Sequence, residues 1–132
     1  MRRVKYEVLT EVIAHAREAT PAECCGVLIG KDGVVLEAVR TGNIADRPTR
    51  FEIDPKDHLA AIKAARSRGL SVVGFYHSHP HSAPIPSETD RSEANYPDQL
   101  HLIVGLASDP PVIRAFRFDG RNFVEEEFVT DG

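Results

Sequence analysis

Hydrophobic and polar residues follow a helical spacing near the start of the chain, between residues 8 and 18. Apolar residues that recur three and four positions apart form one face of a helix, and charged residues occupy the positions between them. Pro21 marks the end of this amphipathic helix. His15 lies among the polar positions, so we expect it to be exposed to solvent. The apolar face comprises Val8, Leu9, Val12, Ile13 and Ala16.

A second helix is predicted to begin at Asp54-Pro55. Aspartate is a favourable N-cap residue, and proline suits the first helical position because its missing N–H would have no helical partner there. Gly69 ends this helix, whose apolar positions are Leu59, Ile62 and Ala65. A short third helix is expected from Ser87, as its cap, through about Tyr96.

The remaining apolar runs are short and bounded by turn residues, which is typical of strands. Residues 24–29 and 34–39 flank the turn Lys31-Asp32-Gly33 and predict a β-hairpin. Further strands are expected at residues 50–53, 71–76, 100–106, 112–118 and 123–129. This order of elements favours an α/β (α+β) fold, with a mixed central β-sheet flanked by helices, in a single domain of residues 1–132.

The composition is that of an ordinary globular protein, and it narrows the classes of partner. Of the 132 residues, 42% are hydrophobic and 27% are charged. Sixteen basic and 20 acidic residues give a net charge of −4, which argues against a nucleic-acid partner because such a partner requires a basic face. No apolar run approaches the ~20 residues of a membrane span, so we expect no membrane partner. The sequence makes no prediction of the oligomeric state.

The two cysteines, Cys24 and Cys25, are adjacent. Neighbouring residues of a strand point to opposite faces, so a disulfide between them would be strained. We expect both to remain thiols that fill the core, as suits a protein of the reducing cytoplasm.

A pair of histidines directly follows the strand expected at residues 71–76. His77 and His79 are two positions apart, so in an extended segment both imidazoles leave the same face and can converge on one ion. The pair precedes a proline-rich loop, and functional groups commonly lie on loops that a rigid scaffold holds. Two ordinary histidines at a sheet edge are the alternative, and His81 is expected to be a loop histidine.

Asp90 adds a carboxylate eleven residues after His79. Two imidazoles and a carboxylate are ligands that zinc accepts, and three protein ligands leave one tetrahedral position open, as in catalytic rather than structural zinc sites. Ser87 and Asp90 also match the spacing of a helix capping box, in which each residue binds the other's main-chain N–H. Capping and metal binding are compatible, because a helix start orients its first turn well.

These motifs together resemble the JAMM motif of the MPN (Mov34/PAD-1) metalloprotease family. In the run His77-x-His79-Pro80, seven residues separate His79 from Ser87, and two more separate Ser87 from Asp90, which matches the family at every ligand position. The segment 21–30, Pro-Ala-Glu-Cys-Cys-Gly-Val-Leu-Ile-Gly, is similar to the family segment that carries an essential glutamate. The segment 50–55 and the helix after it resemble the stretch ahead of the motif, so the likeness covers nearly the whole chain.

The resemblance implies a role for each residue of the motif. His77, His79 and Asp90 would bind one Zn²⁺ per chain, Glu23 would be the general base, and Ser87 would stabilise the developing oxyanion. Spacing does not single out Glu23, because the acids at positions 52, 88 and 93 are equally available.

The resemblance also implies a fold and an activity. The fold would be MPN/JAB-like, with a cytidine-deaminase-like architecture, and the compact form is similar to the stand-alone prokaryotic branch. The activity would be that of a zinc-dependent (iso)peptidase that cleaves after the C-terminal glycine tail of a ubiquitin-like or sulfur-carrier protein. The tail could add as a strand to a sheet edge.

Three other functions stay open. A non-catalytic MPN-like protein-interaction module usually lacks the ligand set, which is complete here. A DNA-repair-associated JAMM-like relative would carry a similar motif, but the acidic balance argues against it, and salt-dependent DNA binding would reveal it. A zinc deaminase requires a Cys-x-x-Cys pair, which this sequence lacks.

Overall fold

Strands of both directions form one sheet at the centre of the protein. The computed structural model describes residues 2–88, 90, 96 and 98–132. In this part of the chain, eight strands pair in the order β7-β6-β5-β4-β2-β3-β1-β8. The strands are β1 (Arg2–Lys5), β2 (Cys25–Lys31), β3 (Val34–Thr41), β4 (Ser71–His79), β5 (Leu100–Gly105), β6 (Val112–Phe118), β7 (Phe123–Glu126) and β8 (Phe128–Asp131). The expected mixed sheet with flanking helices is confirmed.

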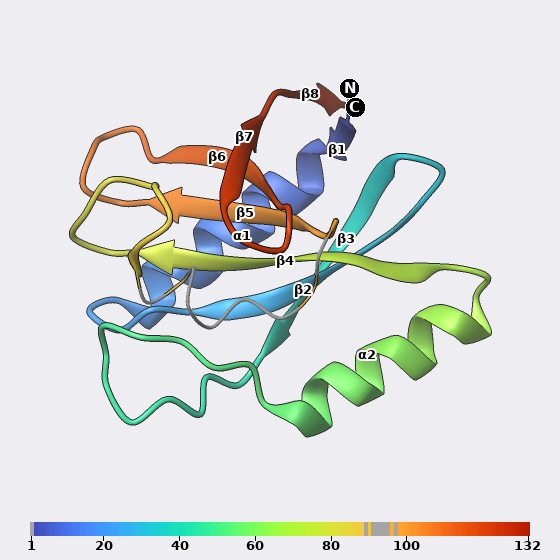
Figure 1. Ribbon diagram of the computed structural model, residues 1–132, viewed down its shortest axis with the longest axis horizontal. Coiled ribbons are helices and arrows are strands. Elements are labelled where there is room, and N and C mark those ends of the chain that lie inside the picture. Colours follow the sequence, from blue (N-terminus) through green and yellow to red (C-terminus); the bar gives the residue numbers. More distant parts are fainter. Residues whose placement is uncertain (1, 89, 91–95, 97) are drawn as a thin grey trace.

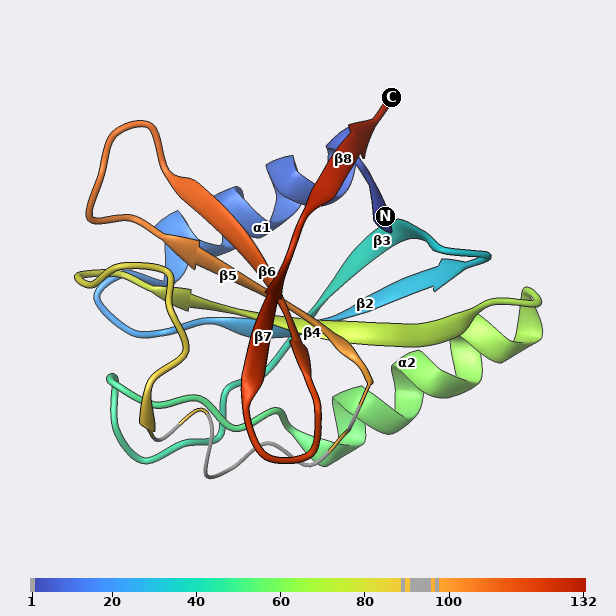
Figure 2. The same cartoon turned by 45° about the horizontal axis from the view of Figure 1, so that its top comes forward.

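Helices α1 and α2 cover opposite faces of this sheet (Figures 1 and 2). Helix α1 (Tyr6–Ala19) buries Val8, Val12 and Ala16 in a core cluster that includes Tyr76 of β4. Helix α2 (Pro55–Ser67) packs Ala61 and Ala65 against the other face, where Phe75 is part of the cluster. Tyr76 and Phe75 are consecutive, so strand alternation divides β4 between the two cores. No helix in the described ranges is long and apolar enough to cross a membrane.

Strand β4 lies in the middle of the sheet and carries the histidine pair. It pairs antiparallel with β2 and parallel with β5. Strand β2 in turn forms the predicted antiparallel hairpin with β3. Helix α2 begins as expected, because the Asp54 carboxylate accepts a hydrogen bond of 2.9 Å from the Lys56 N–H.

Residues 123–129, expected as one strand, form two. Strand β7 pairs with β6 at one edge of the sheet, whereas β8 pairs parallel with β1 at the other edge. A single residue, Glu127, separates them, and Figure 2 shows this red segment crossing the molecule. Because one residue joins the strands at the two edges, the sheet must be strongly curled, which brings these edges close together. The apolar pattern of 123–129 is compatible with either arrangement, and β1 itself is too short and too basic to be predicted.

Three further expectations differ from the structure or lie partly outside it. Residues 50–53 do not form a strand. The β-pairing in this segment is a single isolated bridge between Ile53 and Asn43. His15 is half-buried rather than solvated, and its Nδ1 lies 2.7 Å from the Tyr76 hydroxyl, which needs a partner because the tyrosine is fully buried. In the third helix, Glu88 and Asp90 are helical, and the other positions up to 95 lie outside the described residues.

Candidate metal and catalytic site

The end of β4 brings two imidazoles together on one face of the sheet. The strand continues through His79, so His77 and His79 project to the same side and Ser78 to the other. Their Nε2 atoms lie 3.3 Å apart, and both side chains are almost completely buried. The strand placement therefore confirms the convergence that the spacing predicts.

The carboxylate of Asp90 completes a triangle with the two histidines. Its Oδ2 lies 3.1 Å from Nε2 of His77 and 3.2 Å from Nε2 of His79. Ligand atoms at zinc distances of about 2.0–2.1 Å and tetrahedral angles are about 3.3–3.4 Å apart, so the three atoms have nearly the spacing that one such ion requires. The residues thus fit a zinc ion on their own geometry.

Ser87 and Asp90 form the reciprocal capping box as well. The Ser87 N–H donates to Oδ2 of Asp90 at 2.9 Å, and the Asp90 N–H donates to Oγ of Ser87 at 3.0 Å. The same Oδ2 faces the histidines, so one arrangement can both cap the helix and hold a metal ion. Ser87 is an acceptor in this box, which leaves its hydroxyl hydrogen available for a donor role.

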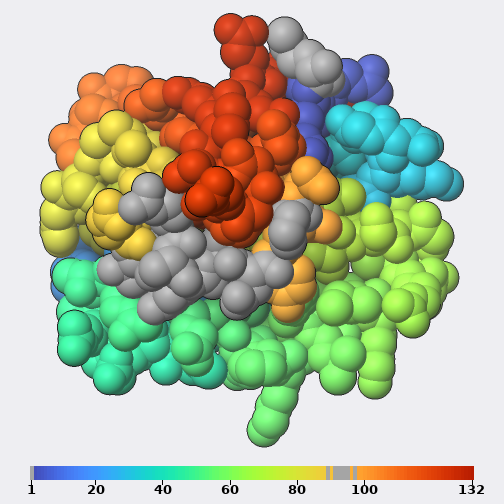
Figure 3. All heavy atoms as spheres, in the orientation of Figure 1, coloured from blue at the N-terminus to red at the C-terminus, as the bar shows by residue number. Residues whose placement is uncertain are grey.

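Contacts outside the triangle orient both imidazoles. Nδ1 of His79 lies 2.8 Å from the carbonyl oxygen of Ala83 and must donate to it, because a carbonyl only accepts. This bond leaves Nε2 of His79 as the atom that can bind a metal. The ring of Phe51 stacks on His77, with centroids 4.1 Å apart. The loops after β3 and after β4 lie side by side at the left of the molecule in Figure 3.

Glu23 is the fourth member of the group. It lies two residues before Cys25, and Cys25 pairs with His77 across β2 and β4. Ligand atoms of Glu23, His77, His79 and Asp90 all lie within 4.8 Å of one another. Oε1 of Glu23 is buried and has no hydrogen-bond partner among the described residues, as expected of a carboxylate whose partner is a metal ligand or substrate.

Burial and neighbouring charge shift the proton affinities of this group. Burial, with a smaller contribution from Asp90 and against the effect of His79, raises the pKa of Glu23 to about 7. Burial lowers the pKa of His77, so its neutral form is favoured. Burial also opposes ionisation of His79, yet its hydrogen bond to Asp90 raises the pKa of that imidazole. Burial favours a protonated Asp90 as well, but hydrogen bonds from the two histidines hold the pKa of this carboxyl well below its usual range.

The other acids, histidine and cysteines that the sequence analysis considered do not belong to the group of Glu23, His77, His79 and Asp90 in the described chain. Glu52 and Glu88 are exposed and do not belong to the metal-binding group found in the described chain, and Glu93 lies outside the described residues. His81 is exposed on the loop after β4. Cys24 and Cys25 are free, buried thiols, as expected, and burial raises the pKa of each to about 11.

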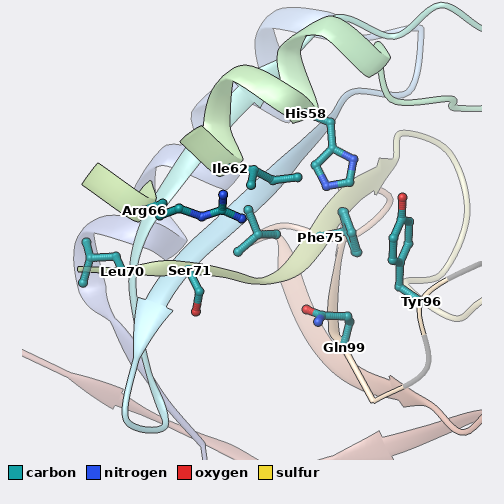
Figure 4. A pocket seen from close by; sticks show the side chains of 9 residues that line it. His58, Ile62, Arg66, Leu70, Ser71, Phe75, Tyr96 and Gln99 are labelled. Atoms are coloured by element: carbon teal, nitrogen blue, oxygen red, sulfur yellow. The ribbon is translucent and has the colours of Figure 1, made fainter. Parts of the chain in front are cut away.

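A separate pocket of about 280 Å³ lies between α2 and the first half of β4 (Figure 4). Its walls include His58, Arg66, Phe75 and Tyr96, with the Phe75 and Tyr96 rings 5.1 Å apart between centroids. Side chains along β4 alternate between the two faces of the sheet, so Phe75 lies on the same face as His77. The pocket therefore opens on the face of the sheet that carries the metal-binding group, without including a member of it.

Comparison with known proteins agrees with this geometry. Residues 5–119 match the family model described as prokaryotic homologs of the JAB domain. The chain is 42% identical over 99 residues to a desampylase of Haloferax volcanii, covering 70% of this chain and 71% of the relative. It is 30% identical over 109 residues to the CysO-cysteine peptidase of Mycobacterium tuberculosis, covering 81% and 74%.

A solved structure extends the comparison to the fold. The solution structure of a protein from Desulfitobacterium hafniense superposes with a TM-score of 0.91 at 34% identity, covering 99% of this chain and 93% of that one. The family model and the relatives carry the conclusion, since they span most of the chain. This chain belongs to the prokaryotic JAB family and is a peptidase of the JAMM/MPN type.

Proposed function

We propose that this protein is a zinc-dependent (iso)peptidase that releases a ubiquitin-like or sulfur-carrier protein from a conjugate by cleaving after its terminal glycine. The observation that carries the proposal is the triangle of His77, His79 and Asp90, at nearly tetrahedral spacing, with the unpartnered Glu23 carboxylate beside it. The names of the relatives support the substrate class, since one is a desampylase and another a CysO-cysteine peptidase.

The residues of the site divide the chemistry among them. His77, His79 and Asp90 would hold one zinc ion, which supplies Lewis acidity and lowers the pKa of water when it is bound. Glu23 takes a proton from the attacking water and delivers it to the leaving amine as the amide C–N bond breaks. In the metal-free protein burial raises the pKa of Glu23 to about 7, and the positive charge of a bound zinc ion would lower it, which favours the carboxylate form that accepts a proton.

Ser87 is proposed as the donor to the oxyanion of the tetrahedral intermediate. Its hydroxyl is fixed by the Asp90 N–H, which removes the entropy cost of orienting it during the reaction. A donor that is held in advance stabilises the transition state more than the substrate, because charge develops on the oxygen only there.

A glycine tail suits a substrate that must reach a buried metal site. His77 and His79 are only 2% and 5% exposed, so the scissile bond has to approach through a narrow opening. Glycine lacks a side chain and can lie close to the protein main chain.

We place the protein in the reducing cytoplasm, which suits the free thiols of Cys24 and Cys25. We also take residues 1–132 to act as one domain.

The test is cleavage of defined conjugates by the zinc-loaded protein. Ubiquitin-like and sulfur-carrier proteins of the source organism, each with a Gly-Gly tail joined to a peptide, a lysine side chain or cysteine, are incubated with and without chelator. Mass spectrometry should show release at the terminal glycine, and both chelation and Glu23→Gln should abolish it. If zinc-replete protein cleaves none of these conjugates, or if Glu23→Gln is as active as the parent, the proposal is wrong.

A further inference from the structure

Among the described residues, the carboxylate of Glu23 has an oxygen, Oε1, that no hydrogen bond orients. Oε1 is buried and has no partner among the described residues. A side chain without such a bond points where its main chain directs it, within the rotamers that packing allows. The position of the general base therefore depends on how the main chain around Glu23 is held.

Two side chains hold the peptide unit that joins Glu23 to Cys24. Its carbonyl oxygen accepts a hydrogen bond of 3.0 Å from Nδ2 of Asn43. Its N–H donates a hydrogen bond of 2.9 Å to Oγ of Ser78. A peptide unit is planar, so bonds to its two polar groups from different directions fix the orientation of the whole plane.

Main-chain bonds reinforce the two side chains. The Glu23 N–H donates to the carbonyl of Pro48 at 3.0 Å, and the Ser78 N–H donates to the carbonyl of Cys24 at 3.1 Å. About two-thirds of protein hydrogen bonds join two main-chain groups, whereas both polar groups of the Glu23–Cys24 peptide bond to side chains.

Asn43 uses its full hydrogen-bonding capacity in this role. Nδ2 also donates to the Arg50 carbonyl, and Oδ1 accepts from the N–H groups of Ala45 and Glu52. Two of the four bonds, to the Arg50 carbonyl and from the Glu52 N–H, hold the segment that carries Phe51, and the bond to the Glu23 carbonyl joins this segment to the main chain of Glu23. Asn43 thereby connects the base to the loop that contacts His77.

Ser78 makes the second connection, to the strand of the metal ligands. It lies between His77 and His79, projects to the opposite face, and is fully buried. A displacement of Ser78 Oγ would displace the Cys24 N–H with it. The two ligands and the base are thus fixed relative to each other through one hydroxyl.

We infer that Asn43 and Ser78 are positioning residues that aim the Glu23 carboxylate at the metal-binding group by clamping the Glu23–Cys24 peptide. This inference rests on the proposed role of Glu23 as the base. We expect the clamp to act on the rate, because its two hydrogen bonds join the Glu23–Cys24 peptide and neither of them contacts the side chain of His77, His79 or Asp90. A 1 Å displacement of a catalytic group can cost roughly 100-fold in rate, so small movements of this peptide matter.

The test compares Asn43→Asp, Ser78→Ala and their combination in zinc-loaded protein. Asn43→Asp keeps an acceptor for Ala45 and Glu52 but loses the donor to the Glu23 carbonyl. For each single variant we expect kcat to fall roughly 10- to 100-fold, with KM and zinc affinity within about twofold of the parent. The double variant should lose less than the product of the two single losses, because both residues act through one peptide.

Two further measurements separate positioning from a general structural role. Amide hydrogen exchange of Cys24 should accelerate at least about tenfold in Ser78→Ala, while core amides of β5 keep their protection. Ser78→Thr retains the hydroxyl and should return kcat to within about threefold of the parent. Asn122→Asp, on the turn before β7, and Ser67→Ala, at the exposed end of α2, are the matched controls and should leave kcat unchanged.

Each outcome decides between the inference and the proposed function. If Glu23→Gln is inactive while the clamp variants keep the kcat of the parent, the inference is wrong and the proposed function stands. If zinc affinity falls in parallel with kcat, the residues support the metal ligands and the inference is again wrong. If Glu23→Gln is fully active, Glu23 is not the base, and the inference fails together with that assignment.

Discussion

Phe51 stacks on the imidazole of His77, with 4.1 Å between the ring centroids and 18° between the ring planes. The histidine is fully enclosed at the end of β4, and Phe51 belongs to the loop between β3 and α2. One face of a proposed metal ligand is therefore held by a loop that is far from it in sequence. Such outer contacts orient the ligand before the metal binds.

Truncation of this ring should weaken metal binding. We expect Phe51→Ala to reduce zinc affinity about tenfold, since loss of an outer partner of a histidine ligand commonly costs 10- to 100-fold. Competition with a chelator of known affinity measures the change, and Phe51→Leu should lie between the variant and the parent. Tyr6→Ala, which removes an aromatic ring that is 61% exposed, is the control and should have no effect. Equal affinity in Phe51→Ala and the parent would show that the stacking has no role in metal binding.

The double use of Ser87 predicts a variant that binds metal but reacts slowly. Ser87→Ala loses the cap and the proposed oxyanion donor, while Asp90 keeps both its contacts with the histidines. We expect zinc content near that of the parent, kcat reduced about 100- to 1000-fold, and a loss of stability of about 1 kcal/mol. Metal analysis of the purified variant, single-turnover kinetics and thermal unfolding provide the three readouts. A variant that has lost its zinc would instead assign Ser87 to the orientation of Asp90.

Asp90→Asn should have the opposite effect to Ser87→Ala, because it keeps the helix cap and weakens metal binding. The amide oxygen can still accept from the Ser87 N–H, so the helix cap survives, but the negative charge beside the two imidazoles is lost. We expect zinc affinity to fall by at least about tenfold and cleavage to disappear at limiting zinc. Titration of both proteins with zinc measures the difference, which would be absent if the carboxylate were only a capping group.

The raised pKa of Glu23 predicts a pH-dependent cost to the stability of the metal-free protein. Burial raises this pKa from 4.5 to about 7, so the folded state holds the proton more tightly than the unfolded state. The resulting stabilisation is complete below about pH 4.5 and is lost as the pH rises through 7. Glu23→Gln has no such titration. The metal-free variant should therefore be more stable than the metal-free parent protein at pH 8.

The size of this effect is about 1–2 kcal/mol, because Glu23 is only half-buried and solvent screens part of the shift. Thermal or urea unfolding of both metal-free proteins at pH 5 and pH 8 measures it. At pH 5 the two proteins should be nearly equal. An equal gap at both pH values would mean that the carboxyl titrates at its ordinary pKa.

Gly26 and Tyr76 predict a change that acts on stability first. A Cβ at position 26 would overlap the ring of Tyr76, which is fully buried and bonded to His15. We expect Gly26→Ala to destabilise the protein by about 1–3 kcal/mol, as overpacked cores do, and to lower Tm by several degrees. Gly120→Ala, where a Cβ would meet open space but the φ of +100° would be strained, tests whether backbone strain has a comparable effect.

Local patterns in the sequence predicted the positions of the three candidate metal ligands, and the resemblance to the JAMM motif assigned them that role. His77 and His79 converge because alternate residues of a strand share a face, and Asp90 is oriented by the capping box with Ser87. Both devices act within a few residues and leave a clear signature in the sequence. The helices at 6–19 and 55–67 and the hairpin of β2 and β3 were predictable for the same reason.

Long-range pairing decided the remainder of the site. Glu23 has no local feature that distinguishes it from other acids, and it reaches the group only because β2 pairs with β4. The roles of Asn43 and Phe51 depend in the same way on a loop that folds back over both strands.

The same limit explains the errors in the fold. Residues 123–129 divide between two edges of a curled sheet, and residues 50–53 bond to the side chain of Asn43 instead of to a strand. His15 is drawn inward by the buried hydroxyl of Tyr76. Each of these outcomes depends on which distant groups form hydrogen bonds with main-chain and buried polar atoms. A periodic pattern of apolar residues does not predict those partners.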